Sequence, residues 1–241
     1  MNFLLDRKRI LLHIGNRVNS SILLFFLLFF GIIFISGCAT WQKEDEATTY
    51  NQLIVKVSLA GNISNQAKYY VVLSDSNDLN LPNLSLSPYF FGPGEWYDEE
   101  SINIGDLRDV DYYYENYFSS WDDFIVLESG SFYLTKGPFP SSADADTHYS
   151  FSRVFVDTHA VISENIITLS FDFDNLNREI TDIYLNIFTV DTLASGRVLS
   201  DCLNSNEYLE NIVGARKTGD DSADSHIPAA LDIRSWELEI N

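Results

Sequence analysis

In the segment "LIVKVSL", residues 53 to 59, an apolar residue recurs at every second position, while Lys56 and Ser58 fall on the other face. Successive side chains of an extended strand point to opposite faces, so this period is typical of a strand with one face in the core and one toward solvent. The predicted buried face consists of Leu53, Val55, Val57 and Leu59.

Other segments are dominated by β-branched and aromatic residues, which favour strands. They are residues 68–73, 123–129, 131–137, 149–156, 166–173, 182–190 and 231–240. The stretches between them, such as "SDSNDLNLPN" and "GPFPSSADAD", are rich in the residues of tight turns. Short antiparallel strands follow from this pattern. With no repeat of fixed period, the sequence predicts one mainly β, antiparallel β-sandwich-like domain with one or two short helices.

Two segments carry a helical signal. Asn204 with Glu207 three residues later forms a capping pattern for a brief helix that ends at Gly214. In residues 109–124, "DVDYYYENYFSSWDDF", four aromatic residues share one helical face, although this segment fits a strand or loop equally well. Those aromatic residues are Tyr114, Tyr117, Phe118 and Trp121.

The chain has 241 residues, 46% hydrophobic and 14% aromatic, which is enough apolar surface to bury a core. Acidic residues number 35 and basic residues 15. From Cys38 onward the count is 34 acidic against 11 basic residues, a net charge of −23. Such a surface repels phosphate backbones, so it argues against sequence-independent nucleic-acid binding.

The first 37 residues have the order of a targeting segment: a basic stretch, an apolar stretch from Ile22 to Ile35, then small residues. As a helix, the apolar stretch would extend only about 21 Å, less than a hydrocarbon core of about 30 Å. The uncharged residues from Val18 to Gly37 would suffice for a marginal span, so a permanent membrane helix remains the alternative. Both interpretations place the residues after Cys38 outside the cytosol.

Ile35-Ser36-Gly37-Cys38 resembles the lipobox of bacterial lipoprotein precursors. The resemblance implies that residues 1–37 are a signal peptide and that Cys38 is the lipid-attachment residue and first residue of the mature chain. Several acyl chains hold a soluble domain on a bilayer, so the membrane is the first expected partner. Ala39 follows the cysteine, where Asp is the residue that retains such proteins at the inner membrane. The implied location is therefore the outer membrane or the cell surface.

The remaining chain divides into two parts. Residues 38–51 are polar and lack an apolar face, so they predict a flexible tether. Residues 52–241 hold the predicted strands and form the expected single domain. Once Cys38 carries lipid, Cys202 has no cysteine partner, and its simplest interpretation is a buried small apolar side chain.

Three segments rich in Asp and Asn are candidates for calcium, which takes six to eight oxygen ligands. The EF-hand spacing is absent from them, and a chain with this many carboxylates forms such clusters by chance. We therefore expect solvated turns, no metal and no cofactor. The residues concerned are Asp75, Asn77, Asp78 and Asn80, then Asp172, Asp174 and Asn177, and finally Asp220, Asp221 and Asp224.

The segment "FFGPGEWYDEES" places Glu95, Trp96 and Tyr97 beside a Gly-Pro-Gly turn. Aromatic rings stack on the apolar faces of sugars and carboxylates accept hydrogen bonds from sugar hydroxyls, so these three residues are the candidate ligand-binding residues. Closure of the end of a core is the competing interpretation. Paired carboxylates between Glu95 and Glu100 also make a glycoside hydrolase conceivable.

Motifs of nucleophilic, zinc and phosphate chemistry are absent from the sequence. Beyond Cys38 the histidines are His148, His159 and His226, which we expect to be scattered and solvated. The predicted function is therefore non-enzymatic: an exported envelope protein with a structural or binding role, with a glycan or an envelope protein as partner. A carboxylate-dependent hydrolase and an accessory subunit of an envelope complex are the alternatives.

Overall fold

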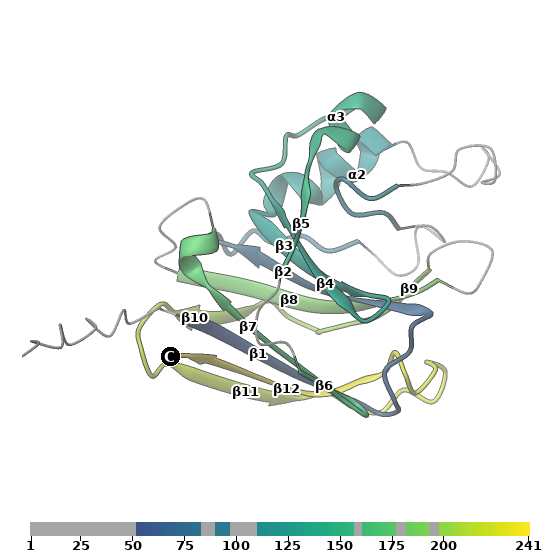
Figure 1. The fold of residues 1–241 in the computed structure, drawn as a ribbon, viewed down its shortest axis with the longest axis vertical. Coiled ribbons are helices and arrows are strands. Elements are labelled where there is room, and N and C mark those ends of the chain that lie inside the picture. Colours follow the sequence, from purple (N-terminus) through teal and green to yellow (C-terminus); the bar gives the residue numbers. More distant parts are fainter. Residues whose placement is uncertain (1–51, 83–89, 97–109, 157–160, 177–181, 193–197) are drawn as a thin grey trace, which may run out of the picture. The chain divides into compact units, whose positions relative to one another are not determined.

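The computed structural model describes residues 52–82, 90–96, 110–156, 161–176, 182–192 and 198–241. These residues form two antiparallel β-sheets that stack face to face (Figure 1). The mainly β, sandwich-like architecture with short helices is therefore confirmed.

Each sheet draws strands from distant parts of the chain. The five-stranded sheet has the order β11 (Arg216–Asp220), β12 (Ile233–Ile240), β1 (Gln52–Leu59), β7 (Ile166–Asp172) and β6 (Val161–Ser163). The seven-stranded sheet has the order β10 (Glu207–Glu210), β8 (Asp182–Asp191), β2 (Ala67–Ser74), β3 (Asp123–Glu128), β4 (Ser131–Lys136) and β5 (Arg153–Phe155), and β9 (Val198–Cys202) also pairs with β8.

Strand β1 lies at the centre of the five-stranded sheet, between β12 and β7. Its predicted inner face is confirmed, because Leu53, Val55, Val57 and Leu59 are all buried against the other sheet. The opposite face of this sheet is mostly polar and half-exposed, with Lys56 beside Glu237 of β12. One buried face and one solvated face explain the period-two pattern of this strand.

The seven-stranded sheet, in contrast, is covered on both faces. All eight residues of β2 are buried. Tyr69 and Val71 belong to the core between the sheets, whereas Tyr70 and Val72 belong to a second core on the outer side. Burial on both faces explains why the central strands of this sheet are continuously apolar rather than alternating.

The second core is strongly aromatic and lies under the helices α2 (Val110–Asn116) and α3 (Ala145–Ser150), which sit on the outer side of the seven-stranded sheet (Figure 1). Phe90 is surrounded there by rings in edge-on or tilted orientations that favour aromatic packing. The rings in contact with it are Tyr70, Tyr113, Phe118, Trp121 and Phe188.

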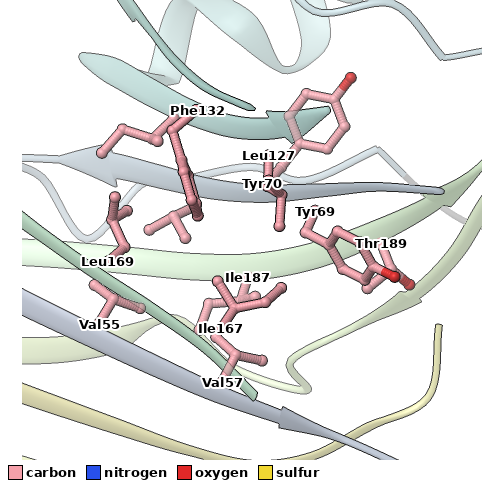
Figure 2. A pocket seen from close by; sticks show the side chains of 12 residues that line it. Val55, Val57, Tyr69, Tyr70, Leu127, Phe132, Ile167, Leu169, Ile187 and Thr189 are labelled. Carbon is pink, nitrogen blue, oxygen red and sulfur yellow. The ribbon is translucent and has the colours of Figure 1, made fainter. Parts of the chain in front are cut away.

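A small apolar cavity lies between the two sheets (Figure 2). Its volume is about 10 Å³, and its lining includes Val57, Phe132, Ile167 and Ile187. This volume is at the lower limit for one water molecule, and an apolar cavity of this kind stays dry. The core between the sheets is therefore packed and offers no room for a ligand at this point.

The predicted helix between Asn204 and Gly214 is wrong. Strand β10 occupies Glu207–Glu210, and a turn follows it. Glu207 and Leu209 of β10 are buried while Tyr208 and Glu210 are exposed, which is a period of two. Pairing with β8 along this edge satisfies the backbone, and this tertiary contact overrides the local capping signal.

The predicted helix within 109–124 is confirmed at its start, since α2 covers Val110–Asn116. A single 3₁₀ turn, η1 (Phe118–Ser120), follows it and places Phe118 and Trp121 in the aromatic core. The predicted strand at 149–156 is correct only for β5. Residues 149 and 150 end helix α3, whose N-cap residue Asp144 accepts a 2.8 Å hydrogen bond from the Thr147 N–H.

Candidate functional site

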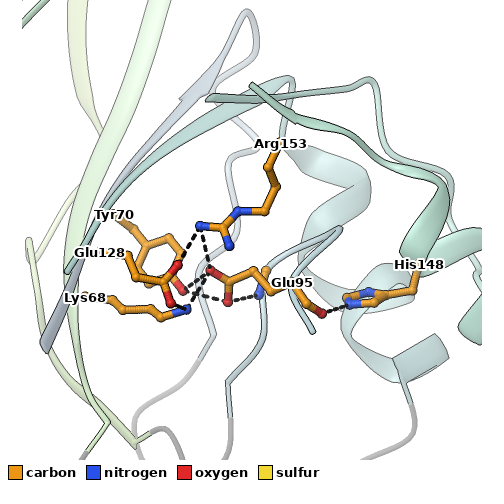
Figure 3. A network of polar contacts seen from close by, with 7 residues as sticks. Lys68, Tyr70, Glu95, Glu128, His148 and Arg153 are labelled. Atoms are coloured by element: carbon orange, nitrogen blue, oxygen red, sulfur yellow. Dashed lines mark hydrogen bonds and ion pairs between the residues drawn. The ribbon is translucent and has the colours of Figure 1, made fainter. Parts of the chain in front are cut away.

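A buried ion network lies on the outer face of the seven-stranded sheet (Figure 3). Lys68, the second residue of β2, is 2% exposed, and Glu95, on the turn of residues 90–96, is fully buried. Lys68 Nζ lies 3.1 Å from Glu95 Oε1 and 2.6 Å from Glu128 Oε1 at the end of β3. A buried ammonium group needs such partners, because an isolated charge in the interior costs several kcal/mol.

Arg153 of β5 completes the network from the sheet edge. Its Nη2 atom lies 2.7 Å from Glu128 Oε2 and 3.9 Å from Glu95 Oε1. The guanidinium carbon also lies 4.5 Å from the centroid of the Tyr133 ring, within the range of a cation–π contact. Two cations and two carboxylates therefore balance one another beside the aromatic core.

The Glu95 carboxylate also fixes the backbone of its own turn. Its Oε2 atom accepts a 3.1 Å hydrogen bond from the Gly92 N–H, and the Glu95 N–H donates to the Gly92 carbonyl at 3.0 Å. The Tyr70 hydroxyl lies 2.9 Å from both carboxylate oxygens. The side chain that the sequence placed in a binding loop thus faces inward and holds the loop on the sheet.

Titration behaviour follows from this pairing. Burial raises the pKa of Glu128, but hydrogen bonds and charge attraction from Lys68 and Arg153 outweigh burial, so its pKa is lowered overall. Burial lowers the pKa of Arg153, and its pairing with Glu128 and Glu95 raises it above its ordinary value. Glu128 is therefore an ionised partner of two cations rather than a proton donor near neutral pH.

His148 of helix α3 connects the turn to the helical layer. It is 1% exposed. Its Nε2 atom lies 2.8 Å from the Glu95 carbonyl oxygen and its Nδ1 atom lies 3.3 Å from the Tyr114 hydroxyl. The prediction that the histidines are solvated is wrong for His148, because these two bonds satisfy both ring nitrogens in the interior, and correct for His226, which is exposed. His159 lies outside the described residues.

Trp96 follows Glu95 directly but is exposed rather than buried. Its side chain is 69% exposed, the largest exposed fraction among the large apolar residues that the structure describes. The turn before it is held by the Glu95 carboxylate and by a 3.0 Å hydrogen bond from the Gly94 N–H to the His148 carbonyl. Tyr97 and the carboxylates at 98–100 lie outside the described residues. Of the three candidate ligand-binding residues, Trp96 alone is seen at the surface.

The Asp-rich segments carry hydrogen bonds within their turns, such as those from the Asp78 N–H to Ser76 Oγ at 3.2 Å and from the His226 N–H to Asp224 Oδ1 at 2.8 Å. The first segment is also tied to a distant part of the chain, because the Asp75 N–H donates to Asp122 Oδ2 at 2.6 Å. Within the described residues, no three side chains of His, Cys, Asp or Glu lie close enough together to hold a metal ion. Asn177 is outside that part of the chain.

Asp201 and Cys202 lie where the two sheets meet. Asp201 Oδ2 accepts a 2.7 Å hydrogen bond from the Ile233 N–H of β12, and its Oδ1 accepts one of 2.9 Å from the Cys202 N–H. Burial, with charge repulsion from Asp221 and Asp232, raises the pKa of Asp201 to about 6 against the effect of these two bonds. Burial likewise raises the pKa of the half-buried Cys202 thiol, which makes it a poor nucleophile.

Sequence reasoning identified Glu95 and Trp96 but missed the other members of the ion network. One signal was available: Lys68 is a charged residue inside the apolar run "AKYYVVLS", and a lysine in a buried strand requires a partner. The identity of that partner was not readable, because Glu95 and Glu128 lie 27 and 60 positions away.

None of the helices in the described part of the chain is long and apolar enough to span a membrane. The chain matches no protein-family model, no curated protein and no solved structure. Functional conclusions therefore rest on the sequence, the fold and the geometry above.

Proposed function

We propose that this chain is an exported, lipid-anchored envelope protein whose β-sandwich domain is a binding module that presents Trp96 to a glycan. The observation that carries the proposal is the contrast between two neighbours. Trp96 is 69% exposed, while Glu95 beside it is fully buried in the ion network. A large aromatic ring is thus held outside the fold by a turn that is itself fixed.

The energetics favour a binding role for such a ring. Exposing an indole forgoes the free energy that burying its large apolar surface would supply. Because Glu95 and Gly94 tie the turn to the sheet and to α3, little backbone freedom remains to be lost when a ligand stacks on the ring. A preorganised aromatic platform of this kind suits the apolar face of a sugar.

The location is proposed from the amino-terminal residues. The sequence around Cys38 supports cleavage of a signal peptide at residues 1–37 and attachment of diacylglyceryl and palmitate-type chains to the cysteine. Residues 38–51 would then tether the domain to the outer membrane or the cell surface. The net charge of −23 from Cys38 onward agrees with a solvated domain outside the cytosol and with no role in nucleic-acid binding.

The test uses the full, lipidated chain in detergent micelles against an array of envelope glycans and extracted envelope proteins. We expect glycan binding by the wild type and at least a tenfold loss of affinity in Trp96→Ala. Phe155→Ala is the matched control, because Phe155 is 56% exposed on β5, and it should bind as the wild type does. Absence of glycan binding by the wild type, or equal losses in both variants, would refute the glycan proposal. Binding to envelope proteins alone would favour the accessory-subunit alternative.

A glycoside hydrolase has less support from the site. Its general acid must keep a proton near the working pH, which requires a raised pKa. The pKa of Glu128 is lowered, and the Glu95 carboxylate contacts Lys68, Tyr70 and the Gly92 N–H. Turnover of an envelope polysaccharide by the wild type that is abolished in Glu95→Gln or Glu99→Gln, with the fold intact, would restore this alternative.

A further inference from the structure

The turn between β10 and β11 presents two adjacent aliphatic side chains to solvent. Ile212 is 58% exposed and Val213 is 56% exposed. The turn is closed by a 2.8 Å hydrogen bond from the Ala215 N–H to the Ile212 carbonyl, and Gly214 has a positive φ of 87°. A Cβ added at Gly214 would meet no atom within 4 Å, so the tip projects into open space.

This turn lies at the end of the sandwich where the domain begins. The Gly214 N–H donates to the Ile240 carbonyl at 2.6 Å, at the end of β12. One residue further on, the Gln52 N–H donates to the Asn241 carbonyl at 2.9 Å. Figure 1 accordingly shows the start of β1, the C-terminus and the β10–β11 turn together at one end.

Other exposed aliphatic and aromatic pairs have a different setting. Val154 with Phe155, and Val161 with Ile162, belong to the edge strands β5 and β6. Neighbouring side chains of a strand point to opposite faces, so neither pair forms a common apolar tip. Ile212 and Val213 lie in a turn, where the alternation of a strand does not apply. Both side chains can therefore enter the same apolar layer.

The residues beside the tip fit a phospholipid surface. Arg216 and Lys217 follow the turn and are 59% and 41% exposed, with ion pairs of 2.7 Å to Glu237 and 2.8 Å to Glu207. Long cationic side chains next to an apolar tip can reach lipid phosphates while the tip enters the acyl region. The nearby carboxylates keep the local charge mixed, which favours zwitterionic over strongly anionic lipid.

Because the connection between the domain and the lipid anchor is short, a contact of only two side chains with the bilayer is sufficient to orient the domain. Gln52 is 14 positions after Cys38, so the start of β1 cannot be further than about 50 Å from a lipidated Cys38 even if the connection is fully extended. Two aliphatic side chains alone would bind a bilayer weakly. An attached domain meets the surface at a high effective concentration, so the same contact becomes populated.

We propose that Ile212 and Val213 insert into the interfacial layer of the bilayer that holds the Cys38 anchor, so that the β10–β11 turn is the membrane-facing end of the domain. This inference rests on the proposed lipid anchor. It gives the domain a preferred orientation on the membrane.

The test places a polarity-sensitive nitrobenzoxadiazole label at Val213→Cys in the lipidated chain, with Cys202→Ser so that the label has one site. The matched control is Val161→Cys, since Val161 is 57% exposed on edge strand β6. After reconstitution into phosphatidylcholine vesicles, we expect a blue-shifted, several-fold brighter emission at 213 that lipid-borne quenchers suppress, and a water-like emission at 161. Vesicle flotation of both proteins with equal, water-like emission would overturn the insertion alone. If neither protein floats with the vesicles, the lipid anchor itself fails and the insertion falls with it.

Discussion

The ammonium group of Lys68 lies 3.1 Å from the carboxylate of Glu95, with the two side chains 2% and 0% exposed. Replacement of Lys68 by Met would leave Glu95 with Arg153 as its nearest cation in the network, at 3.9 Å. A buried carboxylate that loses its closest partner destabilises a fold strongly. We expect Lys68→Met to lower the free energy of unfolding by about 3–5 kcal/mol in urea denaturation.

The control for this prediction is Arg216→Met. Arg216 makes an ion pair of 2.7 Å to Glu237, but the two side chains are 59% and 27% exposed. Solvent screens such a pair, so the expected loss is at most about 1 kcal/mol. Similar losses in the two variants would show that burial of the Lys68 pair carries no special weight.

Substitution of Gly94 and of Gly130 distinguishes backbone strain at a positive φ from steric collision of an added Cβ. Their φ values are 76° and 79°, but a Cβ at Gly94 would collide with the Phe151 carbonyl oxygen, whereas a Cβ at Gly130 would meet nothing within 4 Å. Gly130→Ala should cost about 1 kcal/mol from backbone strain alone. Gly94→Ala should cost more and should loosen the Trp96 turn, measured by thermal unfolding and by glycan affinity. Equal stability losses would contradict the close packing of the turn on α3.

The raised pKa of Asp201 predicts a pH dependence of defined sign. Its pKa is about 6 in the folded chain against an ordinary value of 3.8, so the folded state binds this proton more tightly. Its stabilising contribution is therefore lost as pH rises through about 6 and is fully present below about 3.8, where it reaches about 3 kcal/mol.

The comparison with Asp201→Asn isolates this contribution, because Asn does not titrate. Unfolding free energies measured at pH 7.5 and pH 5 should show the wild type gaining about 1.4 kcal/mol relative to the variant at the lower pH. The pKa of Glu128 is lowered, so its contribution to stability changes with pH in the opposite direction. This contribution is the same in the wild type and the variant, so it cancels in the difference between them. A wild-type advantage that is constant with pH would contradict the raised pKa.

Gly219 of β11 has Trp236 of β12 as its cross-strand partner, and the indole covers the glycine. The indole Nε1 atom is only 2.7 Å from where a Cβ of residue 219 would stand. Gly219→Ala should force the ring to move and cost about 1–3 kcal/mol, with a changed near-ultraviolet circular dichroism band. The exposed neighbour Thr218→Ala should stay within about 0.5 kcal/mol of the wild type.

The strands that form the cores were predictable from sequence, because burial dictates their composition. The alternation in β1 corresponds to burial of one face of the strand. The apolar runs in β2, β3 and β8 correspond to burial of both faces. The edge strands β6, β9, β10 and β11 were not predicted. Strand β6 has only three residues, and "VLSDC", "EYLE" and "RKTGD" carry few β-branched or aromatic residues. Their state is decided by pairing with β7, β8 and β12, which local sequence does not record.

For the candidate site, the turn was predictable but its internal chemistry was not. The Gly-Pro-Gly sequence indicated where Glu95 and Trp96 would sit, yet both neighbours looked like surface residues. The burial of Glu95 depends on Lys68 and Arg153, which reach the turn from β2 and β5. The same holds for His148, whose burial results from the packing of α3 against the turn.

The position of β1 has a mechanical consequence. This strand enters the fold at Gln52 and is hydrogen-bonded to β12 on one side and to β7 on the other along its length. Tension transmitted from the amino-terminal side would load both ladders in shear, so their bonds must fail together rather than peel apart one after another. A domain attached through such a strand can stay folded while a bound ligand is pulled away from the membrane surface.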